Sequence, residues 1–123
     1  MGLEAIGKSK DTAVIEIKDP RTGTVVQNAD GSNMTITVYG PYSSKYKRAI
    51  YDLSDAERPK DAVDAYEERG LQVLLGCIES WNISITEEPL EFSVDAAKML
   101  FTDYRWVRAQ IETVFSDSSY FLG

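Results

Sequence analysis

Residues 34–41 of the chain read MTITVYGP. Met34, Ile36 and Val38 alternate with polar or half-polar residues, which is the two-residue period of a strand with one buried face. The glycine and proline at the end of the stretch stop the strand, because proline has no amide hydrogen to donate to a sheet. This stretch predicts a strand that ends abruptly at residue 40.

The same alternation occurs upstream in residues 13–18, and a short second run follows in residues 24–27. The sequence DPRTG at 19–23 separates the two runs and is typical of a turn, since proline presets φ and glycine accepts positive φ. The sequence NADG at 28–31 predicts a hairpin, because Asp-Gly suits the two positive φ values of a type I′ turn. We therefore expect an N-terminal antiparallel β-meander of about three strands.

A helical period replaces the strand period after the glycine and proline. The first helical face consists of Tyr46, Ile50 and Leu53. Ser43 or Ser44 is positioned to cap the first turn with its hydroxyl group. Pro59 disfavours helical geometry at the preceding residue, so this helix is expected to end near Glu57.

A longer helix is predicted from about residue 60 to residue 81. Its apolar stripe consists of Val63, Tyr66, Leu71, Leu74, Leu75, Ile78 and Trp81. Gly70 lies inside this helix and costs it about 1 kcal/mol relative to alanine. Cys77 flanks the stripe, and we interpret it as a small buried hydrophobic residue.

Helical spacing returns near the C-terminus. Ser93 is suited to cap a helix, with Asp95 near the positive end of the helix dipole. The pair Thr102-Asp103 interrupts or recaps this helix, and a last helical face follows. That face consists of Val107, Ile111, Val114 and Phe115.

These patterns predict one domain of the α+β class. We expect a flexible N-terminal arm over residues 1–10 and a single globular domain over residues 11–123. Within the domain, residues 11–40 are expected to be β-rich, and residues 43–119 are expected to form three to four α-helices. A chain of 123 residues is long enough to build one core without metal or disulfide support.

The composition excludes several classes of chemistry. The chain contains no histidine and one cysteine, which excludes Ser-His-Asp and Cys-His catalysis, a His-ligated metal and an internal disulfide. The net charge is −7; residues 1–60 carry nine basic and eight acidic groups, whereas residues 61–123 carry four and twelve. Non-specific nucleic-acid binding requires clustered positive charge, so the composition argues against it.

One motif is formally complete but lacks its context. Residues 2–9, GLEAIGKS, match the phosphate-binding loop G-x-x-x-x-G-K-[ST]. That loop requires a strand before it and a helix after it, whereas here one residue precedes it and a strand pattern follows. We therefore expect no nucleotide or other cofactor.

The acidic clusters are interpreted as solvated surface rather than as catalytic or metal sites. One cluster lies on the predicted second helix and another lies in a loop without calcium-site spacing. They consist of Asp61, Asp64, Glu67 and Glu68, and of Glu87, Glu88 and Glu91. We expect no catalytic residue and no metal ligand, and hence no enzyme.

A single basic cluster, Lys45, Lys47 and Arg48, is interleaved with tyrosines. Three interpretations stay open. The cluster binds single-stranded nucleic acid by charge and stacking, or Tyr46 belongs to the core while the cations are merely solvated, or the cluster meets the acidic second half of a neighbouring subunit. The cluster is our first candidate partner-binding site, and we do not expect nucleic acid to be the partner.

The C-terminal residues Tyr120, Phe121 and Leu122 form the second candidate partner-binding site. They follow a polar run at 116–119, which resembles a flexible spacer. Three large apolar groups must be buried either on their own domain or on a partner. We favour the partner, because a polar spacer suits a segment that reaches outward.

The chain also resembles a known family along most of its length. The N-terminal half carries Asp19-Pro20-x-Thr22-Gly23, Asp30-Gly31, Ile36-x-Val38-x-Gly40-Pro41 and Ser44-x-Tyr46-x-x-Ala49. The C-terminal half carries Trp81-Asn82, Glu88-Pro89-Leu90, Phe92-Ser93, Ala96-x-x-Met99-Leu100, Tyr104-x-Trp106-Val107 and Ser119-Tyr120-Phe121-Leu122. Over residues 11–122, this order and spacing is similar to the tail assembly chaperones of long-tailed, lambda-like bacteriophages.

The resemblance implies a non-enzymatic role in virion morphogenesis. Such a chaperone binds the tape measure protein, keeps it soluble, and recruits tail tube subunits in the host cell cytoplasm. It is absent from the finished virion, and a frameshift often gives a second, extended form. The alternative is a structural virion component, such as a head–tail connector or a minor tail protein. Neither alternative implies a membrane or a cofactor.

Overall fold

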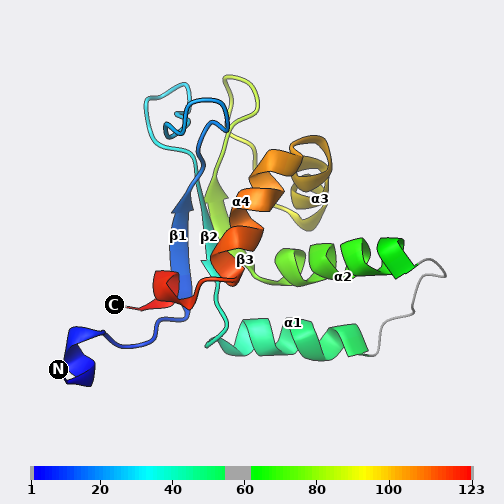
Figure 1. The fold of residues 1–123 in the computed structure, drawn as a ribbon. Coiled ribbons are helices and arrows are strands. Elements are labelled where there is room, and N and C mark those ends of the chain that lie inside the picture. Colours follow the sequence, from blue (N-terminus) through cyan, green and yellow to red (C-terminus); the bar gives the residue numbers. More distant parts are fainter. Residues whose placement is uncertain (1, 55–61, 123) are drawn as a thin grey trace.

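The computed structural model describes residues 2–54 and 62–122 (Figure 1). An antiparallel sheet has the strand order β1 (Thr12–Glu16), β2 (Thr35–Tyr39) and β3 (Ile78–Asn82). Helices α1 (Ser44–Ser54) and α2 (Ala62–Gly76) connect β2 to β3, and α3 (Val94–Asp103) and α4 (Arg105–Phe115) follow β3. The 3-10 helices η1 (Leu3–Ala5) and η2 (Ser118–Phe121) lie near the two ends. This arrangement confirms the predicted α+β class.

The third strand is not the one that the sequence pattern predicted. Residues 24–27 make only isolated bridges, between Val25 and Lys18 and between Gln27 and Asn33. The third strand is instead β3, which was predicted as the end of the long helix and lies within the region 43–119 expected to be helical. Helix α2 ends at Gly76 rather than near Trp81.

A β-bulge in β3 explains this error. Ile78 pairs with Val38 and Trp81 pairs with Ile36, so both side chains share a face, although they are three positions apart in sequence. The register shift between Thr37 and Val38 accommodates the extra residue in β3. A spacing of three therefore mimics a helix in the sequence while belonging to a bulged strand.

The connection between β1 and β2 is held by a closed set of backbone hydrogen bonds. The amide of Ile17 donates to the carbonyl of Met34 at 2.9 Å, that of Met34 donates to Val26 at 2.8 Å, and that of Val26 donates to Ile17 at 2.8 Å. Residues 24–27 are thus used to tie the ends of two strands together, which is why they do not form a strand of the sheet.

Both predicted turns are present, but the second has a different geometry. In the 19–23 turn, the amide of Gly23 donates to the carbonyl of Asp19 at 2.8 Å, with φ of +75° at the glycine. In the 28–31 turn, Gly31 has φ of +87° whereas Asp30 does not have positive φ, so the expected type I′ turn is wrong. The amide of Gly31 donates to Asn28, as in a type I turn followed by a left-handed glycine.

The core lies between one face of the sheet and helices α3 and α4 (Figure 1). The sheet contributes Ala13, Ile15, Ile36, Val38 and Ile78, and the helices contribute Ala97, Leu100, Phe101, Val107, Ile111 and Val114. Ser93 caps α3 as predicted, its hydroxyl accepting the amide of Ala96 at 3.0 Å. The predicted interruption after Thr102-Asp103 is also confirmed, because Tyr104 leaves helical geometry between α3 and α4.

Helices α1 and α2 pack against each other and project from the lower end of the sheet (Figure 1). Ser43 is the cap of α1, since its hydroxyl accepts the amide of Tyr46 at 3.1 Å and donates to the carbonyl of Gly40 at 2.8 Å. The predicted end near Glu57 lies outside the described residues. A Cβ built on Gly76 would lie 3.1 Å from the Cβ of Ala49, so the glycine allows close approach.

The C-terminal segment docks on its own domain, contrary to the expectation of an exposed tail. The Phe121 side chain is completely buried and belongs to the core, whereas Tyr120 remains 49% exposed. The amide of Lys10 donates to the carbonyl of Phe121 at 2.6 Å, and Ser9 forms a bridge with Leu122. The end of the N-terminal arm is therefore paired with the C-terminal segment.

We predict that Gly40 and Phe121 are energetically coupled. A Cβ on Gly40 would overlap the Phe121 ring, so Gly40→Ala is expected to lower the free energy of unfolding by about 1–3 kcal/mol. Phe121→Ala is expected to cost about 3–5 kcal/mol. In the Phe121→Ala background the ring is absent, so Gly40→Ala should lower the free energy of unfolding far less. Urea unfolding of the wild type, the two single variants and the double variant would measure this. Strict additivity would contradict this packing, and Tyr120→Ala is the control that should be nearly neutral.

A second prediction concerns Cys77, which is buried as the sequence indicated. Burial raises the pKa of its thiol from 9.0 to about 11. The native state therefore keeps the proton to higher pH than the unfolded state, so the thiol's contribution to stability is complete below pH 9.0 and is lost as the pH rises toward about 11. Unfolding free energies measured across this range should fall more steeply for the wild type than for Cys77→Ala. Parallel pH profiles would contradict the prediction.

Candidate protein-binding site

Helix α1 presents the predicted basic cluster on its outer face. Tyr46 is half-buried, and its ring lies 5.8 Å from that of Phe115, measured between centroids. Ala49, one turn later, faces Gly76 of α2. Because these two side chains face inward, the three cations around them face outward, and all three are exposed.

Large apolar side chains accompany these cations at the surface. Tyr51 is 62% exposed, and Tyr42 and Ile50 are each 44% exposed. The Arg48 guanidinium lies 5.7 Å from the centre of the Tyr51 ring, and its Nε lies 3.2 Å from the Asp52 carboxylate. We call the set Tyr42, Lys45, Lys47, Arg48, Ile50 and Tyr51 the α1 face.

The α1 face combines positive charge with exposed aromatic area, which suits binding to another protein. Tyrosine and arginine are the residue types enriched at protein interfaces, because each combines apolar contact area with directional hydrogen bonds. Figure 1 shows α2 along one side of α1 and no element on the opposite side in the part of the chain that the structure describes. Tyr46 is half-buried against Phe115, which itself packs on the core, and the geometry does not distinguish between bare solvation and a partner for the three cations.

The second predicted site is not an exposed apolar segment as a whole. Phe121 is buried against Gly40 and is not available at the surface. Leu122 is half-buried and pairs with Ser9. Tyr120 is the one residue of this segment that remains largely exposed.

An apolar pocket at the upper end of the sheet was not predicted. It has a volume of about 180 Å³ and is formed by five separate segments of the chain. We call it the distal pocket; its lining consists of Ile17, Val26, Met34, Ile83, Ser84, Ile85, Leu100, Tyr104, Trp106 and Val107. The Ser84 hydroxyl donates to the Asn28 side-chain oxygen at 2.7 Å, which leaves the lining almost wholly apolar. Each segment reads as ordinary core in the sequence, so no local signal indicates the pocket.

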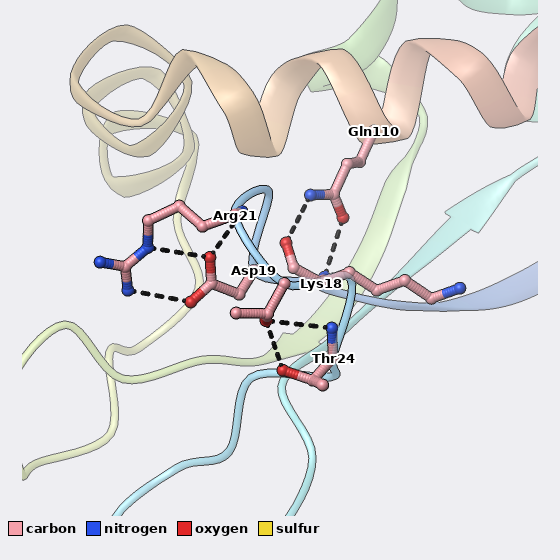
Figure 2. Close-up of polar contacts among 6 residues, drawn as sticks. Lys18, Asp19, Arg21, Thr24 and Gln110 are labelled. Atoms are coloured by element: carbon pink, nitrogen blue, oxygen red, sulfur yellow. Dashed lines mark hydrogen bonds and ion pairs between the residues drawn. The ribbon is translucent and has the colours of Figure 1, made fainter.

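One wall of the distal pocket is fixed to α4 by a side-chain clamp (Figure 2). The amide of Lys18 donates to Oε1 of Gln110 at 2.9 Å, and Nε2 of Gln110 donates to the Lys18 carbonyl at 2.6 Å. In the adjoining turn, the Arg21 guanidinium and amide bind the Asp19 carboxylate and lower its pKa. These contacts hold the chain that follows β1 against the helix.

The acidic residues singled out in the sequence lie at the surface wherever the structure describes their side chains. Glu68, Glu87, Glu88 and Glu91 are exposed, and no described group of three or more acidic or cysteine residues could hold a metal ion. Asp61 lies outside the described residues, as do the side chains of Asp64 and Glu67. The phosphate-loop match at residues 2–9 forms η1 and leads into β1 rather than into a helix.

Comparisons with known proteins give no further assignment. No protein-family model, curated protein or solved structure matches the chain. In addition, the described residues form no helix with the length and apolar character needed to cross a membrane.

We predict that Gln110→Glu disrupts the clamp at neutral pH. The carboxylate cannot donate to the Lys18 carbonyl, so unfolding should become easier by roughly 0.5–1.5 kcal/mol. Protonation restores a donor, so the difference from the wild type should shrink near pH 4, about the ordinary pKa of glutamate. Urea unfolding at both pH values would measure this, with Gln27→Glu as a control because that side chain is exposed. A defect of equal size at both pH values would contradict the assignment.

Proposed function

We propose that this protein is a non-enzymatic tail assembly chaperone of a long-tailed phage. In this proposal it binds the tape measure protein and tail tube subunits in the host cell cytoplasm. The resemblance over residues 11–122 suggests the role, and the α1 face is the structural observation that supports it. Its exposed tyrosines and cations are suited to a protein surface that is apolar and acidic.

The balance of charge favours a protein over nucleic acid as the partner. The α1 face carries three cations, and one of them, Arg48, is already paired with Asp52. The chain as a whole carries a net charge of −7, which repels phosphate backbones at a distance. Nucleic-acid binding by counterion release needs several unpaired cations on one surface, more than this face provides.

The proposed contact is expected to combine two contributions. Burial of Tyr42, Ile50 and Tyr51 supplies apolar area, at about 25 cal/mol per Å² removed from water. Lys45 and Lys47 supply long-range attraction, which speeds association and weakens with salt. The chaperone therefore holds an aggregation-prone partner through exposed apolar groups while its own charge maintains solubility.

Co-expression with the tape measure protein of the same phage would test this proposal. The wild type is expected to increase the soluble fraction of that protein and to co-purify with it. Lys45→Glu, Lys47→Glu and Arg48→Glu together should reduce co-purification at least tenfold while leaving the fold intact. All three side chains are exposed, and a surface pair such as Arg48–Asp52 contributes at most about 1 kcal/mol.

A matched triple variant separates a local effect from a change in net charge. Lys18→Glu, Arg69→Glu and Lys98→Glu alter the total charge equally on exposed residues outside the α1 face, and this variant should still co-purify. Equal loss in both variants would contradict the α1 face as the binding site. Failure of the wild type to co-purify would contradict the chaperone role. Mass spectrometry that detects the protein in purified virions would favour the structural virion component instead.

A further inference from the structure

The N-terminal arm, residues 2–10, carries two apolar side chains that are largely exposed. Helix η1 buries none of its residues, and Leu3 is 84% exposed and Ile6 54% exposed. The backbone of the arm pairs with the rest of the described domain at its end, through Ser9 and Lys10. The arm therefore presents the exposed apolar side chains of Leu3 and Ile6 on a short segment outside the core.

The distal pocket is the complementary feature. Its volume of about 180 Å³ compares with roughly 150 Å³ for a cavity that accepts a benzene-sized group, so it has room for a leucine side chain. Ile85, at the rim, is itself 40% exposed. The pocket is open at the surface and almost wholly apolar, and an apolar side chain from elsewhere would fill it.

Charge around the two features is also complementary. The arm carries Lys8 and Lys10, which are exposed and make no ion pair with another described residue. Ile85 belongs to a loop closed by the bridge between Ser84 and Pro89, and this loop carries Glu87 and Glu88. Both glutamates are exposed and likewise make no described ion pair.

A second pair of opposite charges consists of a cation next to the pocket residues and an acidic residue on the arm. Arg105 is exposed beside the pocket residues Tyr104 and Trp106, and Glu4 is the acidic residue of the arm's 3-10 helix. The chain next to the pocket residues thus carries acidic and basic groups, and the arm also carries both. This is an electrostatic pattern that fixes orientation as well as attraction.

In the structure, the arm and the distal pocket lie at opposite ends of β1 and do not contact each other (Figure 1). The arm enters β1 at Thr12, whereas the distal pocket begins at Ile17, beyond the other end of the same strand (Figure 1). We propose that the arm of one copy inserts Leu3 into the distal pocket of a second copy, so that the chain associates head to tail. Such a contact is heterologous, and it produces a ring or an open row of subunits. It uses no residue of the α1 face and is independent of the function proposed above.

Sedimentation of two complementary variants would test this proposal. The wild type is expected to gain mass with concentration and to lose association as salt is raised. Leu3→Asp replaces the apolar side chain that would be inserted, and Ile85→Lys blocks the pocket. Each substitution should weaken self-association at least tenfold, equivalent to 1.4 kcal/mol. An equimolar mixture of the two should form a 1:1 dimer and nothing larger, because one intact arm meets one intact pocket.

Controls keep the test decisive if Ile85→Lys fails to fold. Glu87→Lys with Glu88→Lys changes only exposed loop residues and should also weaken association with the wild-type arm. Val14→Asp, at an apolar residue that is exposed on β1, should leave association unchanged, as should charge reversal of the α1 face. A wild type that is monomeric at every concentration, a mixture that fails to dimerise, or an effect of Val14→Asp equal to that of Leu3→Asp would overturn the proposal.

Discussion

The pairing of β3 with β2 is the constraint on which the other contacts of the domain depend. Strand β2 is central and is buried on its inner face through Ile36 and Val38. Its partner β3 begins only after the whole α1–α2 pair has been traversed, so the pairing fixes that pair at the base of the sheet. It also sets the path by which α3 and α4 return over the inner face. Without β3, the sheet would be a two-stranded hairpin, which is at best marginally stable in water.

Features with a strictly local cause were predictable from the sequence. The alternation at residues 34–39, the Ser93 cap and the break after Asp103 each depend on neighbouring residues, and each is present. The location of β3 was not predictable, because a bulge places Ile78 and Trp81 on one face at a helical spacing. Tertiary pairing therefore overrode a periodicity that is ambiguous over so short a segment.

The candidate sites also differ in whether neighbouring residues or the tertiary fold create them. The basic cluster on α1 was predictable, since Lys45, Lys47 and Arg48 are adjacent in sequence and a helix displays them together. The burial of Phe121 was not predictable, because the space for its ring exists only where Gly40 lacks a side chain. Gly40 lies eighty-one positions earlier in the sequence. The distal pocket was not predictable from the sequence either, because its walls come from five segments that only the fold brings together.

The buried position of Phe121 bears on how the chain reaches its native state during synthesis. Among the described core residues, Phe121 is the last to leave the ribosome, and its ring occupies the space over Gly40 at the junction of β2 and α1. Until it arrives, that junction is open to water and the edge of β1 near Lys10 lacks its backbone partner. The nascent chain can therefore form the sheet and helices in sequence order but cannot close the core before the final segment emerges. Closure of the core is thus delayed until residue 121 has been synthesised, when the C-terminal segment pairs with Ser9 and Lys10.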